Sequence, residues 1–399
     1  MDARCPADFT ARLRQMGAGM RACIFSLALC SALPALAAET WVVGPKPPQM
    51  SLREALSRAG DGDLIAVMEG DHDAAVGVIT QKKLTLRGIG RRPVLRAGGH
   101  TADGRAMLVV RDGDVTLENL ELRGARAATG NGAGVRLEKG RLRIERCALL
   151  DHEIGLSTAN DADTELAIVD SEFGEAPRSA GGLPHLLHVG RIARLSITGS
   201  RFHQGWEGHL IKSRARVNDI RYNLIFDGWQ GAASYEIDLP NGGLTWLVGN
   251  IIGQGPGAAN RALVAYGNDG QAWPGSALYM SHNTLLSGGA WPARYVRIFE
   301  DRLPPATPLF LVNNVAAGIG FLETWMPGTL QGNVRTLGRW LRAPAMLDFA
   351  LPDGSPLRAQ AVDAAQVNGQ DLRPTAEFAL PIGTRPLKPV TRWAPGALQ

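Results

Sequence analysis

The feature that most constrains the fold of this chain is a short pattern that recurs eight times between residues 116 and 316. Each copy holds a strand-like apolar stretch, then an Asn, Ser or Cys, and then a second apolar stretch. The marker residues lie 23 to 33 residues apart and are Asn119, Cys147, Ser171, Ser200, Asn223, Asn250, Asn283 and Asn314. Periods of about 20–50 residues indicate a solenoid or an array of small units.

The apolar residues within each repeat indicate strands. Val, Ile and Leu alternate with polar residues, as in Val135-Arg136-Leu137 and Leu142-Arg143-Ile144. Such alternation is typical of strands with one buried and one exposed face. A β-propeller blade needs about 40 residues and a leucine-rich repeat needs regular Leu spacing, so neither fits. Three short strands per coil predict an all-β chain, a single-stranded right-handed parallel β-helix.

The same prediction assigns roles to the marker residues and to the two ends of the solenoid. Asn223, Asn250, Asn283 and Asn314 are interpreted as a structural ladder in which each amide bonds the next. Ser51 and Glu54 form a capping box, so a short amphipathic helix over 52–59 is expected to cover the open N-terminal end. The solenoid is expected over residues 38–325, with 326–399 as an irregular Pro-rich tail packed on it.

Residues 1–37 are predicted to be a secretory signal peptide, with 1–19 as an upstream extension. Arg21 precedes the apolar run 22–33, and Ala35-Leu36-Ala37 is an A-x-A cleavage sequence. A periplasmic or secreted protein without a membrane span is therefore expected, and an uncleaved anchor is the alternative. Removal of residues 1–37 leaves Cys147 as the one cysteine, and it is interpreted as a small core residue.

Charge and cofactor signals exclude several classes of function. Without residues 1–37, 38 basic residues face 36 acidic ones, and they are scattered, so no nucleic-acid partner is expected. No cofactor is expected. The oxygen-rich segments 61–63 and 160–163 are weak candidates for Ca²⁺ and are interpreted as turns. The oligomeric state is left open.

The strands between the ladder turns carry the candidate site. If Leu187, Ile211 and Ile237 face inward, then His188, Lys212 and Asp238 stack outward on consecutive coils, about 5 Å apart. Glu236 is expected in a flanking outward column. The candidate substrate-binding residues around these are His209, Arg214, Arg216, Tyr235, Asn241 and Tyr266. Aromatic faces with mixed charges suit a sugar chain.

Several segments resemble the right-handed parallel β-helix proteins of the pectate-lyase-like superfamily. They are residues 52–59, Gly62-Asp63-Leu64-Ile65, 84–88 and the tail segment 348–356. Ile211-Lys212-Ser213, followed by 221–225, resembles the β-helix lyases of alginate and chondroitin-type chains. The resemblance gives Lys212 the role of catalytic base. The family's partner arginine on the next coil is missing, and a carboxylate there favours the charged form of Lys212.

The leading hypothesis is an exported lyase that cleaves a uronate-containing polysaccharide by β-elimination. Such a reaction needs a cation for the carboxylate, a base for the neighbouring proton and an acid for the leaving oxygen. One alternative is an inverting glycosidase that uses Glu236 and Asp238, which lie about 6.5–7 Å apart if both face outward. A second is a non-catalytic protein that binds or assembles polysaccharide, with Lys212 and Asp238 as a solvated ion pair.

Overall fold

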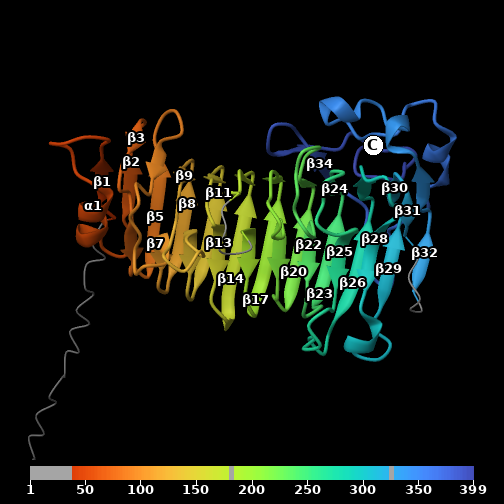
Figure 1. Cartoon of the computed structure of the whole chain (residues 1–399), viewed down its shortest axis with the longest axis horizontal. Helices are drawn as coiled ribbons and strands as arrows, with labels where there is room; N and C mark the ends of the chain where they lie inside the picture. Colours follow the sequence, from red (N-terminus) through yellow and green to blue (C-terminus); the bar gives the residue numbers. More distant parts are fainter. Residues whose placement is uncertain (1–37, 179–183, 323–327) are drawn as a thin grey trace, which may run out of the picture. The chain divides into compact units, whose positions relative to one another are not determined.

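The computed structural model describes residues 38–178, 184–322 and 328–399, and they belong to one compact unit, Ala38–Gln399. The chain coils repeatedly through three sheets, here called A, B and C, and the strands of successive coils pair in parallel (Figure 1). The predicted parallel β-helix is therefore confirmed. The predicted signal peptide, residues 1–37, lies outside the described residues. No helix among the described residues is long and apolar enough to cross a membrane.

The strands of the described residues follow one order in all three sheets, and each coil adds one strand to each sheet. Sheet A contains β1 (Thr40–Val43), β2 (Leu64–Val67), β5 (Lys83–Gly88), β8 (Asp114–Glu118), β11 (Arg141–Glu145), β14 (Asp161–Val169), β17 (Ile192–Thr198), β20 (Val217–Arg221), β23 (Leu244–Val248), β26 (Ala277–Ser281), β29 (Leu309–Val312) and β32 (Thr329–Gln331). Sheet B contains β3 (Asp71–His72), β6 (Val94–Arg96), β9 (Glu121–Arg123), β12 (Ala148–Leu150), β15 (Glu172–Gly174), β18 (Arg201–Phe202), β21 (Leu224–Phe226), β24 (Ile251–Gln254), β27 (Thr284–Ser287), β30 (Val315–Ala317) and β33 (Val334–Thr336). Sheet C contains β4 (Gly77–Ile79), β7 (Ala106–Val110), β10 (Ala133–Leu137), β13 (Ile154–Thr158), β16 (His185–Val189), β19 (Ile211–Ser213), β22 (Ile237–Leu239), β25 (Ala262–Tyr266), β28 (Ala293–Ile298) and β31 (Gly320–Phe321).

The hydrophobic core runs along the inside of the coils because alternate side chains of each strand point inward. In β11, Leu142 and Ile144 are buried, whereas Arg141 and Arg143 are exposed. Leu142 pairs with Leu166 of the next coil, and the inward rows of all three sheets join one continuous core cluster. Apolar burial of this kind is the dominant stabilising term in folding. The described coils are therefore held by stacking of like residues, and Cys147, the one cysteine in the described part of the chain, is buried as predicted.

A ladder of polar side chains lines the turn between sheets A and B. The backbone N–H of each marker from Cys147 to Asn283 donates a hydrogen bond to the side-chain oxygen of the next marker. The amide nitrogens of Asn223, Asn250 and Asn283 also donate to the next amide oxygen at 2.9–3.1 Å. The predicted ladder is confirmed, and it continues to Asn333, which the sequence reading missed.

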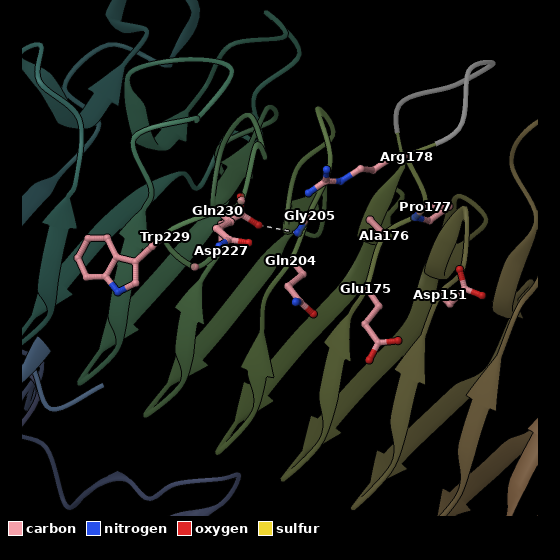
Figure 2. Close-up of a pocket in the computed structure, with 12 residues that line it drawn as sticks. Asp151, Glu175, Ala176, Pro177, Arg178, Gln204, Gly205, Asp227, Trp229 and Gln230 are labelled. Carbon is pink, nitrogen blue, oxygen red and sulfur yellow. Dashed lines mark hydrogen bonds between the residues drawn. The ribbon is translucent and has the colours of Figure 1, made fainter. Parts of the chain in front are cut away.

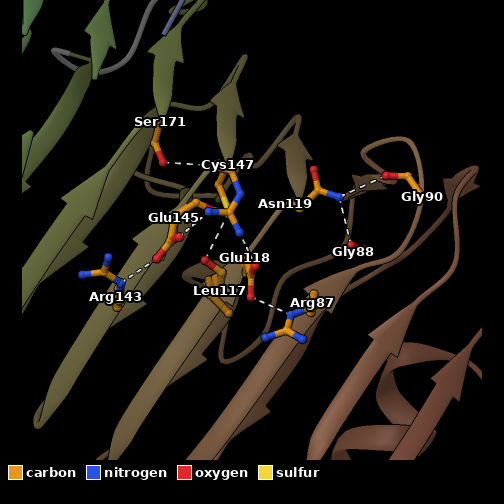
Figure 3. Close-up of polar contacts among 11 residues, drawn as sticks. Arg87, Gly88, Gly90, Leu117, Glu118, Asn119, Arg143, Glu145, Cys147 and Ser171 are labelled. Carbon is orange, nitrogen blue, oxygen red and sulfur yellow. Dashed lines mark hydrogen bonds and ion pairs between the residues drawn. The ribbon is translucent and has the colours of Figure 1, made fainter. Parts of the chain in front are cut away.

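Asn119 lies one residue before the ladder position that the sequence pattern predicts for it. It aligns with Arg146, whose φ is +51°, and its own φ is +53°, so it occupies the left-handed turn position before the ladder. Its amide donates to the carbonyl oxygens of Gly88 and Gly90 instead (Figure 3). Asn adopts this conformation at low cost, which explains its presence there. The ladder position of that coil belongs to the buried Leu120.

The N-terminal end of the solenoid is covered by a helix, as expected. Helix α1 (Leu52–Arg58) starts at the Ser51–Glu54 capping box and buries Leu52, Ala55 and Leu56 against the first strands. The parallel strands continue to Thr336, so the solenoid extends beyond the expected boundary at residue 325. The tail that follows has the short elements η2 (Gly338–Trp340), η3 (Pro344–Met346), η4 (Pro356–Gln360), β34 (Ala376–Phe378) and β35 (Thr384–Pro386), and η1 (Glu300–Arg302) lies earlier, after β28.

The tail packs against the outer faces of sheets A and B. Phe349, Leu351 and Phe378 form a cluster with residues of β21, β24 and β27, and a second tail segment packs on β23, β26 and β29. Its path reaches back along the coils, where the Gly383 N–H donates to the Gly199 carbonyl at 2.7 Å. These two clusters contain no described residue of sheet C. The outer face of sheet C is where the candidate site lies.

Candidate functional site

Three neighbouring strands of sheet C, β16, β19 and β22, carry the core of the candidate site. Leu187, Ile211 and Ile237 pair across these strands and are fully buried in the core. The next residue along each strand therefore points to the outer face. His188 pairs with Lys212, and Lys212 pairs with Asp238. The predicted column on consecutive coils is confirmed.

Asp238 lies at the centre of a network of polar contacts. Its Oδ2 atom is 3.5 Å from the Nζ of Lys212 and 3.4 Å from the Nε2 of His209, and its Oδ1 accepts a hydrogen bond from the Asn268 amide at 3.0 Å. Only 1% of the Asp238 side chain is exposed, against 19% for Lys212. Burial raises the pKa of Asp238, while the charge of Lys212 and the hydrogen bond from Asn268 oppose that rise. The buried Asp238 thus holds the partly exposed Lys212 in position.

A stack of aromatic rings flanks the column. The His185 and His209 ring centroids are 4.9 Å apart, and those of His209 and Tyr235 are 5.0 Å apart. The Tyr235 N–H donates to the Nδ1 of His209 at 3.2 Å. Because Nδ1 accepts, the neutral ring carries its proton on Nε2, which faces Asp238. His209 is thereby held as a hydrogen-bond donor and lacks a free lone pair.

The three histidines of the site are neutral around pH 7. Burial is the largest cause in each, and it lowers the pKa to about 4 for His188, about 3 for His209 and about 2 for His185. The charges of Lys212 and Arg214 add to the shift of His188. The Nη1 of Arg214 lies 3.4 Å from the Nε2 of His188, which places the accepting lone pair of that ring toward Arg214.

The loop over residues 267–276, between β25 and β26, forms one wall of the site. Asp269 Oδ2 lies 3.4 Å from Arg214 Nε, and the indole N–H of Trp273 donates to the Arg214 carbonyl at 3.0 Å. The Arg191 guanidinium lies 3.9 Å from the Trp273 ring centroid and donates to the Gln271 carbonyl. These contacts hold the loop, and with it Arg214, in a defined position.

Several predicted site residues lie elsewhere. Glu236 was expected on the outer face but is fully buried, because it precedes β22 at the corner between sheets B and C and faces Gln254 of β24 at 3.4 Å. Burial raises its pKa well above the ordinary value, and nearby Asp227 adds to the rise. The expectation of an exposed Glu236–Asp238 pair is therefore wrong, and with it the geometry of the inverting glycosidase.

Tyr266, Asn241 and Arg216 are likewise not part of the group around Lys212. Tyr266 pairs with the inward Leu239, is fully buried and donates to the Gly243 carbonyl at 2.6 Å. Asn241 is buried in a turn and donates to the Gln271 carbonyl at 2.8 Å. Arg216 is exposed at the turn before β20. His209, Arg214 and Tyr235 do join the group, as expected.

The sequence reading missed His185, Asp269 and Trp273. A signal for His185 was present, because it lies 24 residues before His209 and so occupies the same position one coil earlier. The roles of Asp269 and Trp273 depend on a loop that folds back over an earlier coil, 55 and 59 residues away from Arg214 in the sequence. Strand alternation gives no information about such a contact.

A separate groove of about 560 Å³ lies on the loops between sheets B and C (Figure 2). Its lining includes Asp151, Glu175, Asp227 and the exposed Trp229. These carboxylates already have partners: Asp151 pairs with Arg126, Glu175 pairs with Arg123, and Asp227 accepts backbone N–H groups of Gly205 and Ala233. On sheet C, by contrast, the partly exposed cations Lys212 and Arg214 lie beside the neutral ring of His188.

Metal-binding geometry is lacking in the described part of the chain. No group of three or more His, Cys, Asp or Glu side chains there could hold a metal ion. Asp63, in one of the two weak calcium segments, accepts hydrogen bonds from Trp41, Glu39 and Gly60. Asp161, in the other, accepts from Thr164 and Asp163. The oxygen atoms of these two aspartates thus serve the local backbone and side chains.

The comparison with solved structures supports the fold. The chain is similar to a structure entitled "Crystal structure of pectate lyase Pel9A", with a TM-score of 0.59 and 13% sequence identity over 84% of this chain and 95% of that chain. No protein-family model matches the sequence, and the comparison with curated proteins gives no match. At this identity the likeness establishes a pectate-lyase-like parallel β-helix and leaves the activity to the chemistry of the site.

Proposed function

We propose that this protein binds an acidic polysaccharide on the outer face of sheet C and cleaves it by β-elimination. The observation that carries the proposal is the juxtaposition of two cations, Lys212 and Arg214, with the neutral imidazole of His188 on adjacent strands. Cations at this position neutralise a uronate carboxylate, which acidifies the ring proton beside it. The pectate lyase of similar fold supports a carbohydrate ligand.

The resemblance to β-helix lyases suggests that Lys212 is the catalytic base. Its contacts instead favour a role as general acid or as a cation that binds the carboxylate. Lys212 lies 3.5 Å from the buried Asp238 carboxylate, a contact that suits a cationic proton donor. The neighbouring imidazole of His188 is neutral at pH 7, and its Nε2 lone pair, which faces Arg214 at 3.4 Å, becomes available when Arg214 binds the carboxylate instead. A bound uronate carboxylate adds negative charge beside it and brings its pKa closer to the operating pH, where a general base is most effective. We therefore assign the base to His188.

The proposed reaction balances with these groups alone. His188 removes the proton on the carbon next to the carboxylate, and the C–H electron pair becomes the new carbon–carbon double bond. The bond from the adjacent ring carbon to the glycosidic oxygen breaks, and the Lys212 ammonium supplies a proton to that oxygen. Arg214 holds the carboxylate while charge builds up on it. The products are a shortened chain and an unsaturated uronate end, and solvent restores both protonation states.

The test is incubation with polygalacturonate, alginate and chondroitin, followed by ultraviolet absorbance of the unsaturated product and by mass spectrometry. We expect activity on at least one of these chains, and a loss of at least about 100-fold in kcat for His188→Ala, as for removal of a general base. His100→Ala is the matched control, since His100 is exposed near the N-terminal end. Lys212→Ala is also expected to lose turnover, with Lys83→Ala on sheet A as its control.

Two results contradict the proposal. Products that gain water rather than a double bond mean hydrolysis and exclude β-elimination. Binding of a glycan on the site without any product means a non-catalytic polysaccharide-binding protein, which keeps the site and removes the reaction.

A further inference from the structure

An arginine on the same outer row of sheet C lacks a partner for its charge. Arg136 of β10 pairs with Ser157 of β13, and Ser157 pairs with His188 of β16. Arg136 therefore lies three strands from Lys212, which is about 14 Å at the usual spacing of 4.7–4.9 Å. The side chains from Arg136 to Lys212 form one row across four consecutive coils.

The contacts of Arg136 leave its guanidinium unsatisfied. Within the described residues, its one hydrogen bond goes from Nη1 to the Ser157 hydroxyl at 3.5 Å, and its Nε atom is buried without a partner. Glu138, whose negative charge favours the charged form of Arg136, is itself bound to Arg111 at 2.6 Å. Burial lowers the pKa of Arg136, and the charge of Arg105 lowers it further.

A half-buried cation without a counter-ion is costly, and a ligand anion removes that cost. We propose that Arg136 and Ser157 form a second anion-binding subsite that holds another acidic group of the same polysaccharide chain. This inference rests on the proposed function and specifies its substrate. The chain is a polyanion that runs across the strands, along the axis of the solenoid, from Lys212 toward Arg136.

The opposite direction from Lys212 does not offer the same path. Asp238 and Ala265, which follow Lys212 in the row, are buried, and Asn268 lies on Asp238. On the other side, His188 and Arg136 are partly exposed, and the residue between them is the small, buried Ser157. A chain with its cleaved bond at His188 thus extends most readily toward Arg136. Long chains are expected to bind better than short oligomers because only the long ones reach both cations.

The test is equilibrium binding of polygalacturonate, dextran sulfate and neutral dextran to the full chain, by titration calorimetry at low and high salt. We expect at least one polyanion to bind, and Arg136→Gln to weaken that binding by about tenfold or more, the value of one charged hydrogen bond. Arg136→Lys restores part of it because the charge returns without the planar fork. Arg141→Gln, the same change at an exposed position of sheet A, is the matched control.

Comparison of the two polyanions separates recognition of carboxylates from recognition of sulfates, and the binding of whichever polyanion binds depends on Arg136 if the subsite exists. Equal affinity of Arg136→Gln and Arg141→Gln overturns the inference, as does tight binding of neutral dextran or the absence of polyanion binding to the unmodified protein. Thermal melting shows that each variant is folded. Arg136-dependent binding without an unsaturated product refutes the lyase but keeps the subsite. If Arg136→Gln turns over the substrate with an unchanged KM, the lyase is kept and the subsite is refuted.

Discussion

The neutral state of His188 predicts how the stability of the protein changes with pH. Its pKa is lowered from 6.5 to about 4 in the folded protein. The unfolded chain therefore binds a proton at His188 as the pH falls below 6.5, whereas the folded protein binds it only near pH 4. The stabilising contribution is complete above pH 6.5 and is lost as the pH falls toward 4.

The size of the effect follows from the two values. At a pH of about 5, the His188 side chain is mostly charged in the unfolded chain and mostly neutral in the folded protein. This pH lies about 1.5 units below the pKa of the unfolded side chain. This costs about 2 kcal/mol of unfolding free energy relative to neutral pH. His188→Gln removes the group, so the variant is expected to lose about 2 kcal/mol less than the unmodified protein over the same pH change.

The assay is urea unfolding followed by circular dichroism at neutral pH and near pH 5. His100→Gln is the matched control, since it removes an exposed histidine, and its pH dependence is expected to follow that of the unmodified protein. If His188→Gln and the unmodified protein lose the same free energy, His188 is not held neutral by its surroundings. The proposed base then has no support.

Two further predictions concern the ladder and the corrected carboxylate. Asn250→Ala removes four buried hydrogen bonds, two accepted from Asn223 and one each donated to Ile220 and Asn283. A loss of about 2–4 kcal/mol in urea unfolding is expected, and a loss near zero means that neighbouring coils, not the ladder, hold the turn. Glu236→Gln replaces a buried acid whose pKa is raised well above its ordinary value by burial and which lies outside the group around Lys212, so turnover of an active polyuronate is expected to stay within about twofold. A large loss of kcat in that variant contradicts the placement of Glu236 outside the site.

The coils and their register were predictable from the sequence because repetition and alternation are local signals. The row of His188, Lys212 and Asp238 follows once Leu187, Ile211 and Ile237 are taken as inward residues. The ladder follows from the spacing of Asn223, Asn250 and Asn283. Each of these assignments needs only the period of a strand and the length of a coil.

The corrections arise where alternation ends. Glu236 precedes its strand, so its side chain turns into the corner beside Gln254. Asn119 is displaced by one residue because the turn needs a left-handed residue before the ladder position. The contacts of Asp269 and Trp273 with Arg214 depend on a loop that returns over an earlier coil. None of these placements follows from a repeat period.

The most direct test of the central claim is a crystal structure of the His188→Ala protein soaked with an oligomer of whichever uronate chain the protein binds. The account predicts electron density on the outer face of sheet C, with one carboxylate within hydrogen-bond distance of Arg214 and Lys212. Density that lies only in the groove beside Trp229, with the face around Lys212 empty, contradicts it.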